Sequence, residues 1–172
     1  MRLVSIKQTF IDIFDFPTEI MSKDSNGNNR PFLLILSLQY KDEKRSFALP
    51  FRSNIQVNSH TKGTYFSLPR RHSTKDRHAH GLHYIKMFPI EKQYCDKYIV
   101  PNKKYDLMIS EYITKNIDKI VNGAQSYLVE YENGKRHNFC VDIDRMLNTL
   151  NEHKAKQETI ETEKQIAALD KE

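Results

Sequence analysis

The chain has 172 residues, 38% of them hydrophobic and 28% charged, with a formal net charge of +5. This length suits one domain with a hydrophobic core, and no apolar run reaches the roughly 18–20 residues that a membrane-spanning helix needs. The N-terminus lacks the apolar region and cleavage site of a signal peptide, so we expect a cytoplasmic protein without a membrane partner. The two cysteines, Cys95 and Cys140, lie among apolar or aromatic residues, which indicates buried free thiols and not a disulfide framework.

Strand patterns dominate the N-terminal part of the chain. A short strand is predicted at 2–6 (RLVSI), and apolar residues with helical spacing follow at 7–16. The segment 30–40 (RPFLLILSLQY) gives the strongest strand signal, because apolar residues alternate along it. A charged turn (KDEK) leads to a second alternating segment at 45–51 (RSFALPF), so the two segments predict a β-hairpin that ends near residue 51.

Helical patterns appear later. Residues 52–81 are expected to be mostly irregular around one short strand (TYFSLP), and 82–90 (LHYIKMFPI) to be extended. Helical periodicity from Tyr105 to Tyr131 predicts one long helix, which the sequence ENGK ends. A final helix is predicted at 139–153, with a polar continuation that is a frayed helix or a tail. These elements predict an α+β fold, in which residues 1–150 form one domain and 151–172 a C-terminal extension.

Positive charge is concentrated between Arg52 and Lys86. Seven Lys/Arg and one acidic residue give this window a net charge of +6, and five of the seven histidines also lie in it. The charge is interleaved with aromatic and turn residues. This pattern favours a polyanionic partner, most simply nucleic acid, over a solvated loop without a partner.

Three polar residues, Arg52, Ser53 and Asn54, directly follow the second hairpin strand (LPFRSNI). A guanidinium can hold two phosphoryl oxygens, a hydroxyl can orient a phosphate, and imidazoles titrate near neutral pH. These groups suit RNA cleavage without a metal, in which the ribose 2′-OH attacks the adjacent phosphate and leaves a 2′,3′-cyclic phosphate and a 5′-OH. Inert polar loops contain the same residue types.

The histidines offer a different interpretation. In HAHGLH, the residues His78, His80 and His83 have the spacing of the H-x-H-x-D-H motif of metallo-β-lactamase-fold hydrolases, and imidazole is a common zinc ligand. Leu82 stands at the aspartate position, which makes the match weak. A zinc-dependent hydrolase and a non-catalytic RNA-binding module are therefore the two alternatives to an RNA-cleaving enzyme.

Four segments, in this order, resemble the toxins of type III toxin–antitoxin systems, the ToxN/AbiQ/CptN/TenpN superfamily. They are NNRPFLLILSLQY (28–40), FALPFRSNI (47–55), HGLHYIKMFPI (80–90) and ISEYITKNIDKIVNGAQSYL (109–128). The resemblance is greatest to the CptN and TenpN branches, in which an RSN-like triplet and an HGLHYIKM-like segment recur. It implies a compact, twisted antiparallel sheet with flanking helices, similar to the Kid/MazF toxins.

The resemblance also implies the activity and partners. The expected protein is a sequence-specific, metal-independent endoribonuclease that needs no cofactor and cleaves cellular mRNA by the 2′-OH route. Its expected inhibitor is a small, repeat-derived, pseudoknot-like antitoxin RNA, which the toxin processes and retains. Toxin and RNA are expected to form a cyclic protein–RNA hetero-oligomer that acts in phage defence or in plasmid or chromosomal maintenance.

Candidate site residues follow by position from the resemblance. Ser53 matches a serine after the second hairpin strand, Arg52 stands where ToxN-like members have threonine, and Arg30 matches an active-site lysine. Ile55 replaces another ToxN-like lysine, so a cation from the basic window has to compensate. The candidate catalytic residues are Arg30, Arg52, Ser53, His83 and Lys86. The candidate RNA-binding residues are Asn54, Arg70, Arg71, Lys75, Arg77, His78, His80 and Lys115, and no metal ligand is assigned.

Overall fold

The computed structural model describes residues 2–16, 20, 23, 27, 30–72, 74–100 and 103–169. The strands in this part of the chain are β1 (Arg2–Ile6), β2 (Phe32–Tyr40), β3 (Glu43–Gln56), β4 (Tyr65–Leu68), β5 (His78–His83), β6 (Phe88–Pro89) and β7 (Cys95–Lys97). The α-helices are α1 (Gln8–Ile11), α2 (Lys104–Lys115), α3 (Ile117–Glu132) and α4 (Ile143–Leu169). Three 3₁₀ turns complete them: η1 (Ser59–Thr61), η2 (Tyr84–Lys86) and η3 (Lys92–Tyr94).

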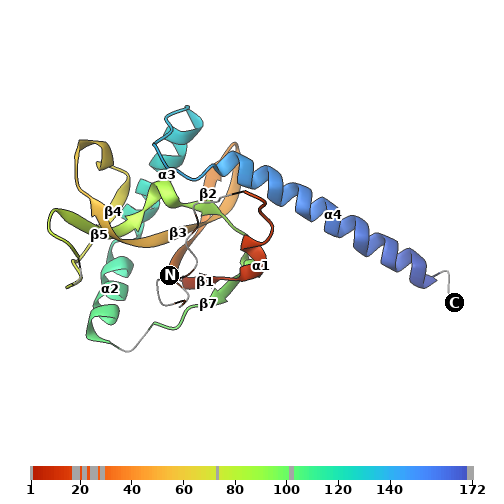
Figure 1. The fold of residues 1–172 in the computed structure, drawn as a ribbon, viewed down its shortest axis with the longest axis horizontal. Coiled ribbons are helices and arrows are strands. Elements are labelled where there is room, and N and C mark those ends of the chain that lie inside the picture. The colour runs from red at the N-terminus through yellow and green to blue at the C-terminus, as the bar shows by residue number, and fades with distance from the viewer. Residues whose placement is uncertain are drawn as a thin grey trace.

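The strands form one antiparallel sheet in the order β4-β5-β3-β2-β1-β7, and β6 pairs with β3 (Figure 1). The long strand β3 lies near the centre and contacts β2 on one side and β5 on the other. Helix α3 packs against β2, and α4 packs against β6. This arrangement confirms the predicted α+β class with flanking helices.

The predicted hairpin is present and is formed by β2 and β3. Lys41 and Asp42 make a two-residue turn with φ values of 48° and 62°, and Tyr40 pairs with Glu43. Two consecutive left-handed residues are typical of a type I′ turn, whose twist matches that of the strands. The hairpin does not end near residue 51, however, because β3 continues to Gln56 and pairs there with β5. The prediction of mostly irregular structure over 52–81 was therefore wrong at both ends.

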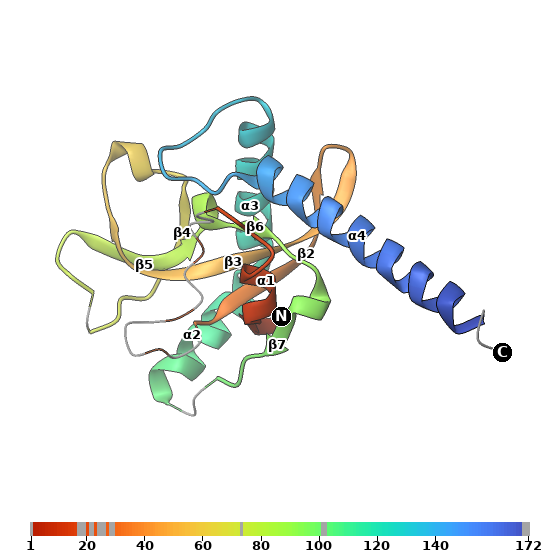
Figure 2. The ribbon, with the colours of Figure 1, turned by 45° about the vertical axis from the view of Figure 1, so that its right-hand side comes forward.

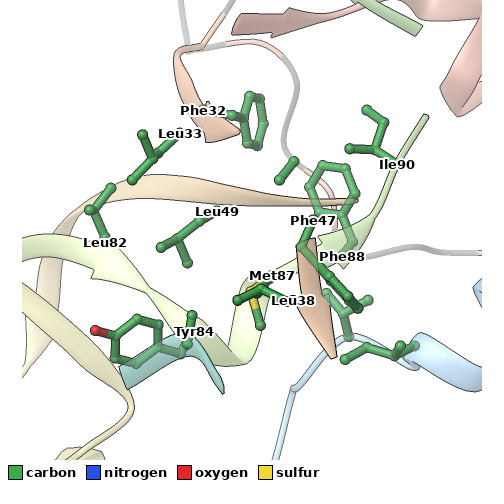
Figure 3. Packing of buried hydrophobic residues seen from close by; sticks show 14 of the residues in the cluster. Phe32, Leu33, Leu38, Phe47, Leu49, Leu82, Tyr84, Met87, Phe88 and Ile90 are labelled. Atoms are coloured by element: carbon green, nitrogen blue, oxygen red, sulfur yellow. The ribbon is translucent and has the colours of Figure 1, made fainter. Parts of the chain in front are cut away.

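Register determines which residues of the central strands share a face of the sheet. Leu33 pairs with Leu49, and Phe51 with Leu82, so these residues share the face that carries the core beneath α3. The helix contributes a buried stripe to this core: Ile120, Ala124, Tyr127, Leu128 and Tyr131. Figure 3 shows Leu49, Leu82, Tyr84 and Met87 in the same hydrophobic cluster.

The segment 82–90 is not extended throughout, as predicted, but turns at η2. The N–H of Met87 donates to the carbonyl of Tyr84 at 2.9 Å, which closes the turn. The Tyr84 ring lies against Gly123 of α3, where an added Cβ would be 2.3 Å from the Tyr84 hydroxyl oxygen. Close packing of an aromatic ring on a glycine thus fixes η2 against α3, an interaction between residues far apart in the sequence.

The predicted long helix over residues 105–131 is two helices. At Asn116 the backbone leaves the helical conformation, with φ −116° and ψ 16°, and its side-chain amide donates to the carbonyl of Tyr112 at 2.8 Å. Buried Ile109 and Ile113 of α2 still continue the apolar stripe of α3. The periodicity therefore identified the buried residues correctly and missed the break between the helices.

The last helix, α4, begins at Ile143 and extends beyond the predicted end to Leu169. The Asp142 side chain accepts a hydrogen bond from the N–H of Arg145 at 3.0 Å, as an N-cap does. Where the structure describes burial along α4, over 143–166, the buried residues are in the first half of the helix: Ile143, Met146, Leu147 and Leu150. Beyond them the helix projects from the body (Figure 2). The division into a domain at 1–150 and an extension stays a prediction, and residues 170–172 lie outside the described residues.

Asp144, in the first turn of α4, connects this helix to the hairpin. Its carboxylate accepts hydrogen bonds from the Tyr40 hydroxyl at 2.8 Å and from Arg136 at 2.8 Å, and pairs with Lys41 at 2.5 Å. Burial acts to raise the pKa of Asp144, but the hydrogen bonds from these three groups outweigh it and hold the pKa below its ordinary value. None of the described helices is both long and apolar enough to span a bilayer.

Candidate active site

A pocket lies on the sheet face opposite α3, and three predicted catalytic residues line it. Register explains their convergence: Phe32 pairs with Pro50 and Arg52 pairs with Gly81, so Pro50 and Arg52 share this face, and His83 of β5 shares it as well. The lining residues are Ile20, Arg30, Pro31, Phe32, Pro50, Phe51, Arg52, Lys86 and Phe88. The structure therefore brings together Arg30 before β2, Arg52 on β3 and Lys86 on η2.

The pocket combines cations with apolar walls. Lys86 is 6% exposed although it carries an ammonium group, and Arg30 is held in place by a hydrogen bond from Nε to the carbonyl of Lys23 at 2.8 Å. None of the described lining residues is acidic. Cations in such a partly desolvated site attract an anion more strongly than cations in water do. The arrangement suits a phosphate group.

His83 lies beside this pocket, 7% exposed, and its Nδ1 has no hydrogen-bond partner among the described residues. Burial, together with positive charge on Arg52, Lys86 and His137, lowers the pKa of His83 to about 4. The imidazole is therefore neutral at pH 7. His137, which follows α3, was not predicted from the sequence because it lies outside the basic window and only the fold brings it near His83.

The pKa of His83 predicts how stability depends on pH. Its folded-state pKa of about 4 is below the ordinary value of 6.5, so between these pH values the unfolded chain binds a proton that the folded chain does not. The free energy of unfolding should therefore fall as the pH is lowered through this window, by up to about 3 kcal/mol from this residue. Urea unfolding at pH 7, 5.5 and 4.5 should show a weaker pH dependence in His83→Gln than in the wild type.

A matched control is His60→Gln, since His60 is exposed in η1. This variant should retain the pH dependence of the wild type. An equal slope in wild type and His83→Gln would contradict the assignment.

Ser53 and Asn54 lie in a β-bulge of β3. Arg52 pairs with Gly81 and Ile55 with Ala79, so β3 has one more residue here than β5. Asn54 adopts the left-handed conformation with φ 58°, which asparagine tolerates better than most residues, and its Oδ1 accepts the N–H of Lys75 at 2.9 Å. Bulges often redirect side chains next to active sites. This one leaves Ser53 exposed beside Arg52.

The predicted RNA-binding residues from 70 to 78 form a basic loop. Arg70 donates to the carbonyls of Thr74 and Lys75 at 3.2 and 3.0 Å, and so closes the loop on itself. Arg71 pairs with Asp106 of α2 at 3.3 Å. Lys75 and Arg77 are exposed, and the His78 ring is 2.8 Å from the carbonyl of Asp76. The side chains of Arg70 and Arg71 thus stabilise the conformation of the loop, whereas the charged side chains of Lys75 and Arg77 are exposed to solvent.

Two further predictions concern histidines. His80 is 7% exposed, and its Nδ1 lies 3.0 Å from the Tyr105 hydroxyl; its part in RNA binding stays a prediction. In the described part of the chain, no three His, Cys, Asp or Glu residues are grouped so as to hold a metal ion. The histidines of HAHGLH, on which the zinc-hydrolase alternative was based, therefore do not form such a group. Lys115 is exposed at the end of α2 and does not line the pocket.

No protein-family model and no curated protein matches the sequence. Solved structures do match. A protein of a bacterial antiviral system that a processed non-coding RNA regulates has a TM-score of 0.61 and 19% identity, with 81% of this chain and 91% of that chain covered. A bacterial type III system in which a non-coding RNA pseudoknot selectively inhibits the toxin gives a TM-score of 0.63 at 16% identity, covering 89% and 97%. AbiQ, a lactococcal anti-phage endoribonuclease of a type III toxin–antitoxin system, gives 0.61 at 12% identity, covering 90% and 98%.

The chain has the fold of the type III toxins. The four segments that carry the resemblance correspond to β2, β3, β5 to β6, and α2 to α3, which surround the pocket or support it; residues 28 and 29 lie outside the described residues. Assignment to the CptN or TenpN branch stays a prediction.

Proposed function

We propose that the protein is a metal-independent, sequence-specific endoribonuclease toxin of a type III toxin–antitoxin system. The observation that carries the proposal is the pocket, where Arg30, Arg52 and Lys86 meet and no described lining residue is acidic. It occurs in a fold shared with an anti-phage endoribonuclease. A pocket of this kind suits the phosphate of an RNA chain, and the exposed Ser53, which follows Arg52 in the chain, supplies a hydroxyl that orients this phosphate.

The reaction we propose forms a bond between the ribose 2′-oxygen and phosphorus and breaks the bond from phosphorus to the 5′-oxygen. Arg52 and Lys86 stabilise the extra negative charge on the non-bridging oxygens in the transition state. The neutral imidazole of His83 accepts the 2′-OH proton, and the Lys86 ammonium donates a proton to the leaving 5′-oxygen. A bound phosphate offsets the cations that lower the pKa of His83, and so makes this imidazole a stronger base.

The proposed inhibitor is a small, repeat-derived antitoxin RNA, and cellular mRNA is the proposed substrate. Support comes from the structural neighbours, in which non-coding RNA regulates the system or inhibits the toxin. The exposed cations Lys75 and Arg77 of the basic loop would contact the backbone of such an RNA. A cyclic protein–RNA complex in the cytoplasm, acting in phage defence, completes the proposal.

The test is cleavage of cellular RNA by the purified protein in the presence of EDTA, with analysis of the product ends. We expect cleavage to persist and products to carry 2′,3′-cyclic phosphate and 5′-OH ends. Ser53→Ala should lower kcat by about 100-fold or more and leave the fold and RNA binding intact. Ser126→Ala, on the exposed surface of α3, is the matched control.

Full activity of Ser53→Ala would exclude Ser53 from the reaction. Binding of RNA by the wild type without any cleavage would instead support the non-catalytic RNA-binding alternative.

A further inference from the structure

The connection between α3 and α4 contains a tight turn from His137 to Cys140. The N–H of Cys140 donates to the carbonyl of His137 at 3.2 Å, which closes a β-turn. Phe139 occupies the third position of this turn with φ 60°, and its side chain is 79% exposed. An aromatic residue is thus held in a left-handed conformation with its ring in solvent.

Neither property of Phe139 stabilises the fold. A positive φ at the third position of a turn favours glycine or asparagine, and a bulky residue there is strained. The exposed ring gains little from burial. Five residues earlier, the chain places Gly134 at a positive φ of 82°, where no side chain is required. Strained backbone conformations that persist in folded proteins are concentrated at functional sites. The conformation of Phe139 therefore suggests that its ring contacts a ligand.

The turn is fixed at both of its ends, by a contact with α3 and by a hydrogen bond to η2. The His137 ring stacks on Tyr127 of α3, with a centroid distance of 6.3 Å, and its charge acts on His83. On the other side, the N–H of Val141 donates to the carbonyl of Ile85 at 2.9 Å. Ile85 directly precedes Lys86, which lines the pocket. Phe139 therefore lies two residues along the chain from a backbone hydrogen bond to the neighbour of Lys86.

An exposed aromatic ring near a phosphate-binding pocket suits a nucleic-acid base as its ligand. Proteins that bind single-stranded nucleic acid combine cations for the backbone with exposed aromatic rings on which bases stack. We propose that Phe139 stacks on an RNA base near the scissile phosphate and is a positioning and specificity-determining residue. The proposal deepens the proposed function and rests on it, because the pocket cations hold the phosphate of the same RNA.

The test compares Phe139→Gly and Phe139→Trp with the wild type. Cleavage sites in total cellular RNA are mapped from the new 5′-OH ends, and kinetics are then measured on an oligonucleotide with the wild-type cleavage sequence. Phe139→Gly should lower kcat/KM by about 5- to 100-fold, mainly through KM, and weaken the base preference at one position near the cut. Phe139→Trp should retain both.

A second measurement separates a role in RNA binding from a role in folding. Because glycine relieves the positive φ, Phe139→Gly should raise Tm by about 2–4 °C. The control is Ile99→Gly, since Ile99 is 81% exposed and lies outside the pocket lining; it should leave kcat/KM unchanged.

The possible results distinguish the stacking proposal from the proposed function. If the wild type cleaves RNA and Phe139→Gly has unchanged kcat/KM and base preference, the stacking proposal is wrong and the proposed function stands. A lower Tm in Phe139→Gly would assign the ring to folding or to a protein contact, and also overturns it. If the wild type cleaves no RNA, the proposed function fails, and the stacking proposal fails with it.

Discussion

Replacing Lys86 with methionine should lower kcat for RNA cleavage by about 100- to 1,000-fold. Methionine has nearly the same length and suits the buried position, since Lys86 is 6% exposed, but it provides no charge to the phosphorane and no proton to the leaving oxygen. Methionine keeps the buried volume filled, so the variant is expected to remain folded. Single-turnover cleavage kinetics, together with a thermal unfolding curve, measure both effects.

The control for Lys86→Met is Lys97→Met. Lys97 is exposed on β7, at the opposite edge of the sheet from β5 and β4. This variant loses the same charge from the molecule as a whole and should cleave RNA as the wild type does. If the two variants lost the same activity, general electrostatic attraction of RNA would account for the effect, and Lys86 would have no specific role.

The largest effect on stability is expected from Gly81→Ala. An added Cβ would lie 2.5 Å from the backbone carbonyl oxygen of Phe66 and 3.0 Å from the Tyr65 ring. The backbone contact cannot be relieved by a change of rotamer, so β4 has to move away from β5. We expect the free energy of unfolding to fall by about 1–3 kcal/mol or more. Activity should fall too, since Gly81 pairs directly with Arg52.

Urea unfolding of the double variant Tyr65→Ala/Gly81→Ala identifies the cause. If the backbone oxygen of Phe66 is responsible, removal of the Tyr65 ring does not restore the stability lost in Gly81→Ala beyond the effect of Tyr65→Ala alone. Full recovery would show that the ring caused the clash. An unfolding midpoint of Gly81→Ala equal to that of the wild type would show that the strands are not as tightly spaced as described.

Local patterns in the sequence predicted the elements that depend on local chemistry. Alternating apolar residues predicted the β2–β3 hairpin, and helical periodicity predicted which residues of α2 and α3 are buried. The break at Asn116 was missed because an apolar stripe can continue across two consecutive helices that pack on the same sheet. The extension of β3 was missed because residues 52–56 are mostly polar and lack an alternating apolar pattern. They form a strand because they pair with β5.

The site was predicted only in part, because its assembly depends on contacts between residues far apart in the sequence. Arg30, Arg52 and Lys86 were proposed from resemblance and charge, but their convergence depends on strand register and on the turn at η2. The burial of His80 against Tyr105 was not predicted, because the two residues are 25 positions apart and no local pattern connects them. His137 and Phe139 have no local signal at all. Their importance depends on a hydrogen bond between Val141 and Ile85, which are 56 positions apart in the chain.

The bond between Asn54 and Lys75 limits how this protein can vary during evolution. Because Asn54 binds the main-chain N–H of residue 75, an insertion or deletion in the basic loop that shifts this N–H would displace the bulge and Ser53 with it. The side chains of Lys75 and Arg77 take no part in the contact. Under the proposed function, loop length and the geometry of cleavage are thus inherited together, whereas the side chains of Lys75 and Arg77 are free to adapt to a different RNA. Antitoxin choice and catalysis could then diverge separately, provided that the loop keeps its length.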